Sequence, residues 1–162
     1  MLVSNTSTLV LLAKVNCLET FIEISPVIDI PAQVKQEALF EKDSYYAKRI
    51  QKLIDEKKIS VANVNRNQIT NIMSQFKLDE GEAATYALFD SKKYYAILTD
   101  DGELIKLCKL EKVPFICAMA IVISLFEKKK LSKETALSKL EDLHIVGRYS
   151  KKLYEHFKSE VK

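Results

Sequence analysis

Residues that interrupt regular structure are scarce in this sequence, which has three glycines, three prolines and no tryptophan among 162 residues. So few turn-forming residues argue against a loop-rich, low-complexity or all-β protein. No linker, composition shift or internal repeat divides the chain. We therefore expect a single domain over residues 1–162, long enough to bury about 70% of the surface that the unfolded chain exposes.

Cysteine chemistry and membrane insertion are also poorly supported. Cys17, Cys108 and Cys117 are odd in number, lack CxxC spacing and lie among apolar residues, which is typical of buried free thiols in a reducing compartment. The longest apolar run, residues 115–126, has 12 residues, whereas a membrane span needs about 20. No signal peptide is recognisable, so we expect a cytoplasmic protein that does not enter a membrane.

Common catalytic and cofactor-binding motifs are missing as well. The only histidines are His144 and His156, no Ser–His–acid arrangement is visible, and neither a Walker A loop nor a GxGxxG motif occurs. The formal net charge is only +3, too small to indicate nucleic-acid binding by itself. Residues 127–162 hold 10 basic and 6 acidic residues. A phosphate-attracting surface would involve this segment, although a solvated, lysine-rich helical face explains the pattern equally well.

Short apolar runs alternate with helical patterns along the chain. The runs predicted to be strands are Met1–Ser4, Val27–Ile30, Ile59–Val64, Tyr95–Leu98 and Pro114–Cys117. Apolar spacing predicts helices between them, including a long one that begins at Pro31 and breaks near Asp43, and a helical C-terminal part with a break near Ser132. This alternation predicts an α/β fold: a parallel sheet covered by helices on both faces, with ligands at the carboxyl ends of the strands.

Polar residues occur where such a fold places its chemistry. Asn5 follows the first strand, Asp100 and Asp101 follow the fourth, and Glu37 and Glu82 lie in the first turns of two helices. Clustered carboxylates repel one another unless a cation lies between them, and oxygen ligands suit Mg²⁺ or Mn²⁺. Such a cation lowers the pKa of bound water and stabilises the transition state of phosphodiester hydrolysis. The pattern therefore favours metal-assisted hydrolysis.

Each of these residues also has a purely structural interpretation. Asn5 can be a helix N-cap, Glu37 a first-turn acid that complements the helix dipole, and Asp100–Gly102 a turn. Asp79 and Glu82 fit a capping box, in which the cap and the third helical residue bond each other's backbone. Five tyrosines could stack RNA bases, although at helical spacing such residues are more often half-buried core: Tyr45, Tyr46, Tyr94, Tyr95 and Tyr149.

Taken in order, these segments resemble a PIN domain. The opening MLVSNTSTLVLLAKVN is similar to the PIN start, and PAQVKQEAL, LDEGEAATYAL and ILTDDGELIKLCK are similar to its later blocks. The segment that continues through VPFICAMAIVISLFEKKKLS resembles a subgroup related to the toxins of VapBC toxin–antitoxin pairs. The resemblance covers nearly the whole chain. It implies a PIN-like three-layer α/β/α sandwich around a central parallel sheet of about five strands.

The resemblance implies a metal-dependent ribonuclease that uses Mg²⁺ or Mn²⁺ to cleave RNA with a metal-activated water. The catalytic residues that carry over are Asn5, Glu37, Glu82 and Asp101. The implied metal ligands are Glu37, Glu82 and Asp101, with Asp100 as an extra acid and Thr6, Ser7 and Thr99 in support. Family members often form homodimers, and the toxins are silenced by a small antitoxin protein.

Asn5 departs from the family pattern, which has an aspartate at this place. Asparagine keeps one carbonyl oxygen but removes a negative charge, so metal affinity should fall and catalysis should lose transition-state stabilisation. Asp100 could supply the missing charge. Two functions stay open: a metal-dependent endoribonuclease, and a catalytically impaired PIN-fold module that binds RNA or protein. A third interpretation is a scaffold in which every acid is a cap or a turn.

Overall fold

Five short parallel strands form the centre of the computed structural model, which describes residues 1–162. They are β1 (Leu2–Ser4), β2 (Ile28–Pro31), β3 (Ile59–Ala62), β4 (Ala96–Leu98) and β5 (Phe115–Ile116). Their order in the sheet is β3-β2-β1-β4-β5, and every neighbouring pair is parallel. The five strands and the parallel sheet predicted from the sequence are confirmed, with bounds shifted by one or two residues.

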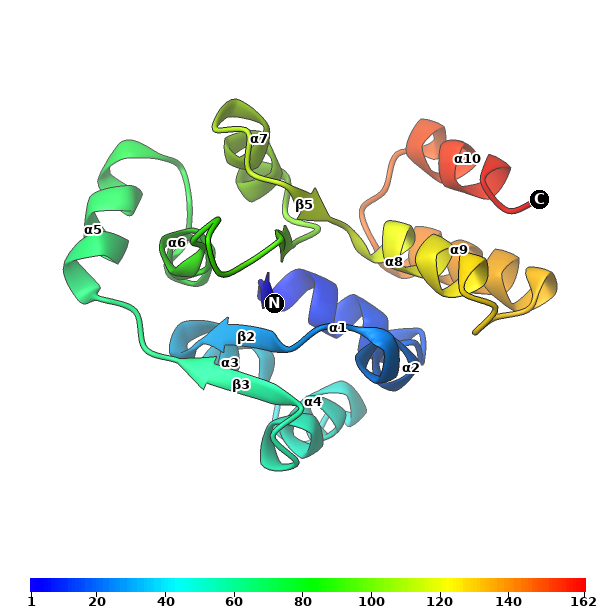
Figure 1. Ribbon diagram of the computed structural model, residues 1–162, viewed down its shortest axis with the longest axis horizontal. Coiled ribbons are helices and arrows are strands. Elements are labelled where there is room, and N and C mark those ends of the chain that lie inside the picture. The colour runs from blue at the N-terminus through cyan, green and yellow to red at the C-terminus, as the bar shows by residue number, and fades with distance from the viewer.

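Helices cover both faces of this sheet, which gives the expected three-layer α/β/α sandwich (Figure 1). The larger core is formed with α1 (Thr6–Lys14), α2 (Leu18–Ile24), α3 (Ala32–Ala38), α4 (Tyr45–Asp55), α8 (Ala118–Glu127) and α9 (Lys133–Val146). The smaller core is formed with α5 (Arg66–Gln75), α6 (Glu80–Leu88) and α7 (Gly102–Leu110). The last helix, α10 (Lys151–Ser159), packs on α8 and α9, at the opposite end of the molecule from α5 (Figure 1).

Strand β4 shows how the sequence serves two cores at once. Ala96 and Leu98 belong to the larger core, and Ile97 between them belongs to the smaller one. Successive side chains of a strand point to opposite faces, so a strand covered on both faces needs a continuous apolar run rather than an alternating one. The apolar run at residues 115–126 is likewise β5 followed by the buried helix α8, as predicted.

Both predicted breaks in the helical segments are present. The helical part after Pro31 is interrupted at residues 39–44, which include the break predicted near Asp43. Because α3 already ends at Ala38, Glu37 lies in its last turn, and the interpretation of Glu37 as a first-turn acid was wrong. The C-terminal part breaks near Ser132, as predicted, and again at Gly147, between α9 and α10. A Cβ at Gly147 would lie 2.8 Å from the Leu143 carbonyl oxygen, so a side chain at this position would collide with the end of α9.

The scarcity of glycine is visible at the helix ends. Asn16, Lys57, Lys112 and Lys129 have φ angles of 58° to 60°, the left-handed conformation that glycine usually provides after a helix. All four directly follow the C-terminal ends of helices. Non-glycine residues adopt this conformation at a cost of about 1 kcal/mol each, which the packing of the two cores must offset.

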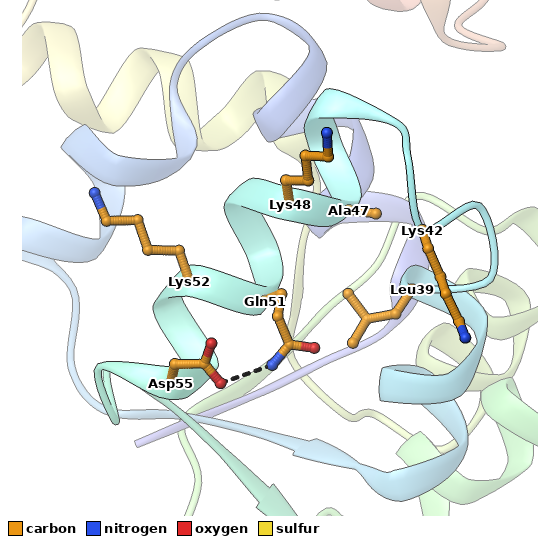
Figure 2. Close-up of a pocket in the computed structure, with 7 residues that line it drawn as sticks. All are labelled: Leu39, Lys42, Ala47, Lys48, Gln51, Lys52 and Asp55. Atoms are coloured by element: carbon orange, nitrogen blue, oxygen red, sulfur yellow. Dashed lines mark hydrogen bonds between the residues drawn. The ribbon is translucent and has the colours of Figure 1, made fainter.

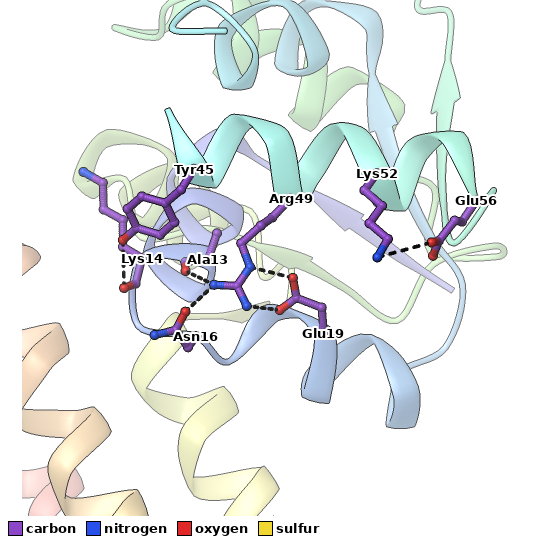
Figure 3. A network of polar contacts seen from close by, with 8 residues as sticks. All are labelled: Ala13, Lys14, Asn16, Glu19, Tyr45, Arg49, Lys52 and Glu56. Carbon is purple, nitrogen blue, oxygen red and sulfur yellow. Dashed lines mark hydrogen bonds and ion pairs between the residues drawn. The ribbon is translucent and has the colours of Figure 1, made fainter. Parts of the chain in front are cut away.

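Arg49 fixes α4 against α1 and α2 (Figure 3). Its guanidinium donates to both carboxylate oxygens of Glu19, at 2.7 and 2.9 Å, and also to the side chain of Asn16. The Tyr45 hydroxyl donates to the Lys14 carbonyl oxygen at 3.0 Å. A bidentate arginine–carboxylate pair constrains orientation as well as distance, so the outer face of α4 is presented at a fixed angle.

Candidate active site

Two strand ends meet where the order of the sheet reverses. β1 has β2 on one side and β4 on the other, and ligands of open α/β sheets bind outside the carboxyl ends of strands at such a point. Asn5 directly follows β1, and Thr99 directly follows β4. The Asn5 backbone N–H donates to the Leu98 carbonyl oxygen at 2.8 Å, which holds the two strand ends together.

The Asn5 side chain does not act as a helix cap. Asn5 occupies the N-cap position of α1 but makes no side-chain capping bond, so its predicted structural interpretation does not hold. Its Nδ2 donates to Thr99 Oγ1 at 3.4 Å, whereas its Oδ1 is buried and has no hydrogen-bond partner. An unpartnered buried carbonyl oxygen costs about 1–3 kcal/mol. The residue is only 3% exposed, and no bond within the chain offsets this cost.

Asp101 lies on the same side of the sheet as Asn5, linked through Thr99. Thr99 Oγ1 receives the Asn5 amide and also accepts from the Asp101 backbone N–H at 3.1 Å. Asp101 is the N-cap of α7, and its Oδ2 accepts from the Leu104 N–H at 2.8 Å. One carboxylate oxygen therefore has a structural role, while the charge stays at the strand ends.

Glu82 forms a structural hydrogen bond, and the pKa of its carboxyl is raised. It forms the predicted capping box with Asp79: the Asp79 N–H donates to Glu82 Oε2 at 2.9 Å, and the Glu82 N–H donates to Asp79 Oδ1 at 2.8 Å. The pKa of the Glu82 carboxyl is raised to about 8, chiefly by burial; the hydrogen bond from the Asp79 N–H lowers it, and the negative charges of Asp79 and Asp101 add to the increase. A hydrogen bond between the side chains of Glu82 and Asp101 acts in the same direction as burial.

Glu37 lies next to this group at the end of α3. Thr6 Oγ1 donates to its Oε2 at 3.0 Å, and its carboxylate lies against Gly81, where a Cβ would be only 1.9 Å from Oε1. Burial raises the pKa of Glu37, and the charge of Asp79 adds to the effect. A carboxylate in the last turn of a helix opposes the helix dipole, so helix stability does not explain this residue.

Asn5, Glu37, Glu82 and Asp101 together form what we call the acidic edge. As they stand, no three His, Cys, Asp or Glu side chains lie close enough together to hold a metal ion. The edge nevertheless offers oxygen donors of the kind that hard cations prefer: the unpartnered Asn5 Oδ1 and the carboxyls of Glu82 and Asp101. Burial is the main cause of the raised pKa values of Glu37 and Glu82, and the charges of neighbouring carboxylates add to it. By their chemistry these oxygen donors suit a hard cation, but the carboxylates do not converge on one metal position in this structure.

Asp100 faces a different set of partners. Its Oδ2 accepts from Thr8 Oγ1 at 2.7 Å and from the Ala118 N–H at 3.0 Å, and its Oδ1 accepts from the Tyr149 hydroxyl. Its own backbone N–H donates to Ser7 Oγ at 2.9 Å. Ser7 thus supports the chain at Asp100, while Asp100 ties α1, the start of α8 and the segment before α10 together. The structure brings it beside the acidic edge but gives both of its oxygens other bonds.

The contacts of two residues near the acidic edge, Tyr149 and Gly81, were not predicted from the sequence. Tyr149, expected to be half-buried core or a base-stacking residue, is half-buried and bonds Asp100 across 49 positions. Gly81 leaves the space that Glu37 fills. A glycine inside the first turn of a helix is a signal for such a close approach. Of the remaining tyrosines, Tyr94 is buried, Tyr46 is half-buried, and Tyr45 and Tyr95 are exposed.

The protonation of Glu82 should make stability depend on pH. The pKa of about 8 in the folded protein lies above the ordinary value near 4.3 in an unfolded chain, so the folded state holds this proton more tightly. Its stabilising contribution is complete at low pH and is lost as the pH rises through about 8. We expect the thermal midpoint in EDTA to fall between about pH 5 and about pH 8, and to fall less in Glu82→Gln.

Glu111→Gln is the control for this measurement, because Glu111 is an exposed residue at the far end of α7. It removes the same charge and should leave the pH dependence of the thermal midpoint unchanged. Equal slopes in wild type and Glu82→Gln would show that Glu82 does not carry the raised pKa.

The comparison with known families agrees with this geometry. The family model described as a PIN domain (DUF3368) matches residues 1–162. No curated protein and no solved structure matches the chain. None of the ten helices has the length and apolar character needed to cross a membrane.

Proposed function

Because the chain belongs to the PIN-domain family, whose members are generally nucleases, we propose that it is a metal-dependent endoribonuclease. The observation that carries the proposal is the buried Asn5 Oδ1, which has no hydrogen-bond partner. It lies at the strand end of the acidic edge, linked through Thr99 to Asp101. A divalent cation would satisfy this oxygen and relieve the repulsion between carboxylates with one interaction.

Each residue of the acidic edge has its own role in the proposed mechanism. Asn5, Glu82 and Asp101 would hold the cation, and Glu37 would contact it directly or through water, oriented by Thr6. When bound, the cation supplies charge stabilisation for the phosphodiester and acidifies water. Glu82 must lose its proton to act as a ligand. Its raised pKa makes this loss harder at neutral pH, so cation binding should strengthen as the pH rises toward about 8. Thr99 keeps Asn5 and Asp101 in register.

We also propose a biological role for the protein. It would be a VapC-like toxin that acts on RNA in the cytoplasm, forms homodimers and is silenced by a small antitoxin protein. The support is the sequence resemblance of the segment that ends near Ser132. A small gene directly upstream, whose product copurifies with this protein, is the expected result for a toxin–antitoxin pair.

One observation favours a second function. Asn5 carries no charge, so the acidic edge has one negative charge fewer than the aspartate of the family pattern would give it. A weaker cation site would leave a PIN-fold module that binds RNA or protein without cleaving it. The two functions share the same geometry and differ in turnover.

Cleavage of structured and single-stranded RNAs, in Mn²⁺ or in EDTA, separates the two functions. We expect wild type to cleave in Mn²⁺ and not in EDTA. Cleavage by Asn5→Asp but not by wild type would mean an intact site disarmed at one ligand, and the binding module would replace the nuclease. No cleavage by either protein would contradict the proposed catalysis.

Gly81→Ala tests the role of Glu37 without removing it. The new Cβ would displace the flexible Glu37 carboxylate, while the gain in helix propensity of up to about 1 kcal/mol offsets the lost contacts. We expect a nearly unchanged thermal midpoint and cleavage in Mn²⁺ reduced about 10-fold, because small misplacements at an active site are costly. Gly102→Ala is the matched control, since nothing lies within 4 Å of its Cβ position. Equal activity of the two variants would remove Glu37 from the mechanism.

A further inference from the structure

A lysine-lined hollow lies between the segment after α3 and the outer face of α4 (Figure 2). Its volume is about 380 Å³. The residues that line it are Leu39, Lys42, Ala47, Lys48, Gln51, Lys52 and Asp55. Leu39, which lines the hollow, is two residues after Glu37 of the acidic edge.

The ammonium groups of this hollow are available to a ligand. Lys42 and Lys48 form no ion pair, and Lys52 has only a long contact of 3.9 Å with Glu56. The one acid in the lining, Asp55, accepts a hydrogen bond from the Gln51 amide at 2.8 Å (Figure 2). Three lysines against one aspartate give the lining a net positive charge, and Lys42 and Lys48 have no acidic partner within the chain.

Phe40, three residues after Glu37 and two before Lys42, is almost entirely solvated. Its side chain is 83% exposed, the highest value among the large apolar residues that the surface exposes. Its backbone N–H donates to the Glu37 carbonyl oxygen at 3.2 Å, which fixes the ring's attachment point next to the edge. A phenylalanine stabilises a fold when its ring is buried, so the fold gains almost nothing from this exposed ring.

We propose that Phe40 and the lysine-lined hollow form a binding path for single-stranded RNA that leads to the acidic edge. One base stacks on the Phe40 ring, and the neighbouring phosphates lie against Lys42 and Lys48. Aromatic stacking combined with a positive groove is the general way proteins hold single strands. The inference rests on the proposed function, because the path is useful only if RNA is the ligand of the edge.

The same surface fits a second copy of this chain poorly. A twofold contact centred on Phe40 would bring Lys42 and Lys48 of one copy toward the same residues of the other. Like charges facing each other across an interface cost several kcal/mol. The same lysine charges that would repel a second copy attract a polyanion such as RNA.

Fluorescence anisotropy of a labelled single-stranded RNA in EDTA tests the path without any cleavage. Phe40→Ala should weaken binding about 10-fold and leave the salt dependence unchanged, because stacking involves no ion release. Lys42→Gln/Lys48→Gln should weaken binding and lower the magnitude of the slope of log K against log salt by about 1.4, about 0.7 per phosphate contact. The charge-matched control Lys109→Gln/Lys112→Gln, on exposed positions at the end of α7, should bind like wild type.

A strand that lacks all of its bases tests the stacking contact separately, since it has no base to stack on Phe40. The difference in affinity between wild type and Phe40→Ala should therefore shrink with a fully abasic strand. RNA binding that is absent in wild type, or equal in all variants, overturns the proposal, as does a loss of dimer in Phe40→Ala with RNA affinity unchanged. Binding that follows the predictions in a protein that never cleaves RNA would overturn the proposed catalysis and keep the path.

Discussion

Glu82→Gln is expected to lower the rate of RNA cleavage in Mn²⁺ about 10³-fold while leaving the protein folded. Losing one charged ligand from a divalent site removes several kcal/mol of transition-state stabilisation, and about 4 kcal/mol corresponds to this factor. Stability should be kept because glutamine also completes a capping box, so the bond from the Asp79 N–H survives. The rate is measured under single-turnover conditions, with the thermal midpoint beside it.

Glu111→Gln is again the matched control, and it should cleave RNA at the wild-type rate. The variant and the control differ in where the charge is lost: Glu82 lies at the acidic edge, and Glu111 at the far end of α7. Undiminished cleavage in Glu82→Gln would place the activity outside the acidic edge or in a contaminating nuclease.

Asp100→Ala is expected to lower the free energy of unfolding by about 3–5 kcal/mol, the range seen when one partner of a buried charged network is removed. The substitution deletes the acceptor of Thr8, of the Ala118 N–H and of Tyr149. The N-terminus of α8 would lose its carboxylate, and three donors would lose their partner. Urea unfolding of wild type and variant measures the difference.

Tyr149→Phe tests one hydrogen bond of Asp100 by itself, and Asp142→Ala is its control. Tyr149→Phe removes one hydrogen bond to a carboxylate and should cost about 1.5–3 kcal/mol, whereas Asp142→Ala, at an exposed position of α9, should cost little. A loss below about 1 kcal/mol in Asp100→Ala would contradict the structural role. It would reopen the prediction that Asp100 supplies the charge that Asn5 lacks.

If Asp100 has only a structural role, Asp100→Asn should bind Mn²⁺ with the same affinity as wild type.

Much of the fold follows from local pattern. The five apolar runs predicted all five strands, and their alternation with helices predicted a parallel sheet. The capping box of Asp79 and Glu82 was predictable because its partners are three residues apart. The break near Asp43 was predicted as well, but the end of α3 at Ala38 was not, since apolar residues continue in helical spacing past it.

The site was harder to predict because its bonds join distant parts of the chain. Strand ends alone placed Asn5 and Asp101 on one edge, but the sequence could not show that Asn5 fails to cap its helix and leaves Oδ1 unpartnered. Nor could it distinguish the neighbouring acids Asp100 and Asp101. One caps α7, and the other bonds Tyr149 from the segment between α9 and α10. Only the positions of the start of α8 and of the segment between α9 and α10, which supply the donors to Asp100, decide between them.

Titration calorimetry with Mn²⁺ tests the central claim most directly, because it asks for the cation without requiring turnover. The account predicts one Mn²⁺ per chain, bound by wild type, weakened at least about 10-fold in Glu82→Gln and in Asp101→Asn, and strengthened in Asn5→Asp. Binding should be unchanged in Glu111→Gln. Failure of both wild type and Asn5→Asp to bind Mn²⁺, or affinity that is indifferent to Glu82, would contradict a metal site at the acidic edge.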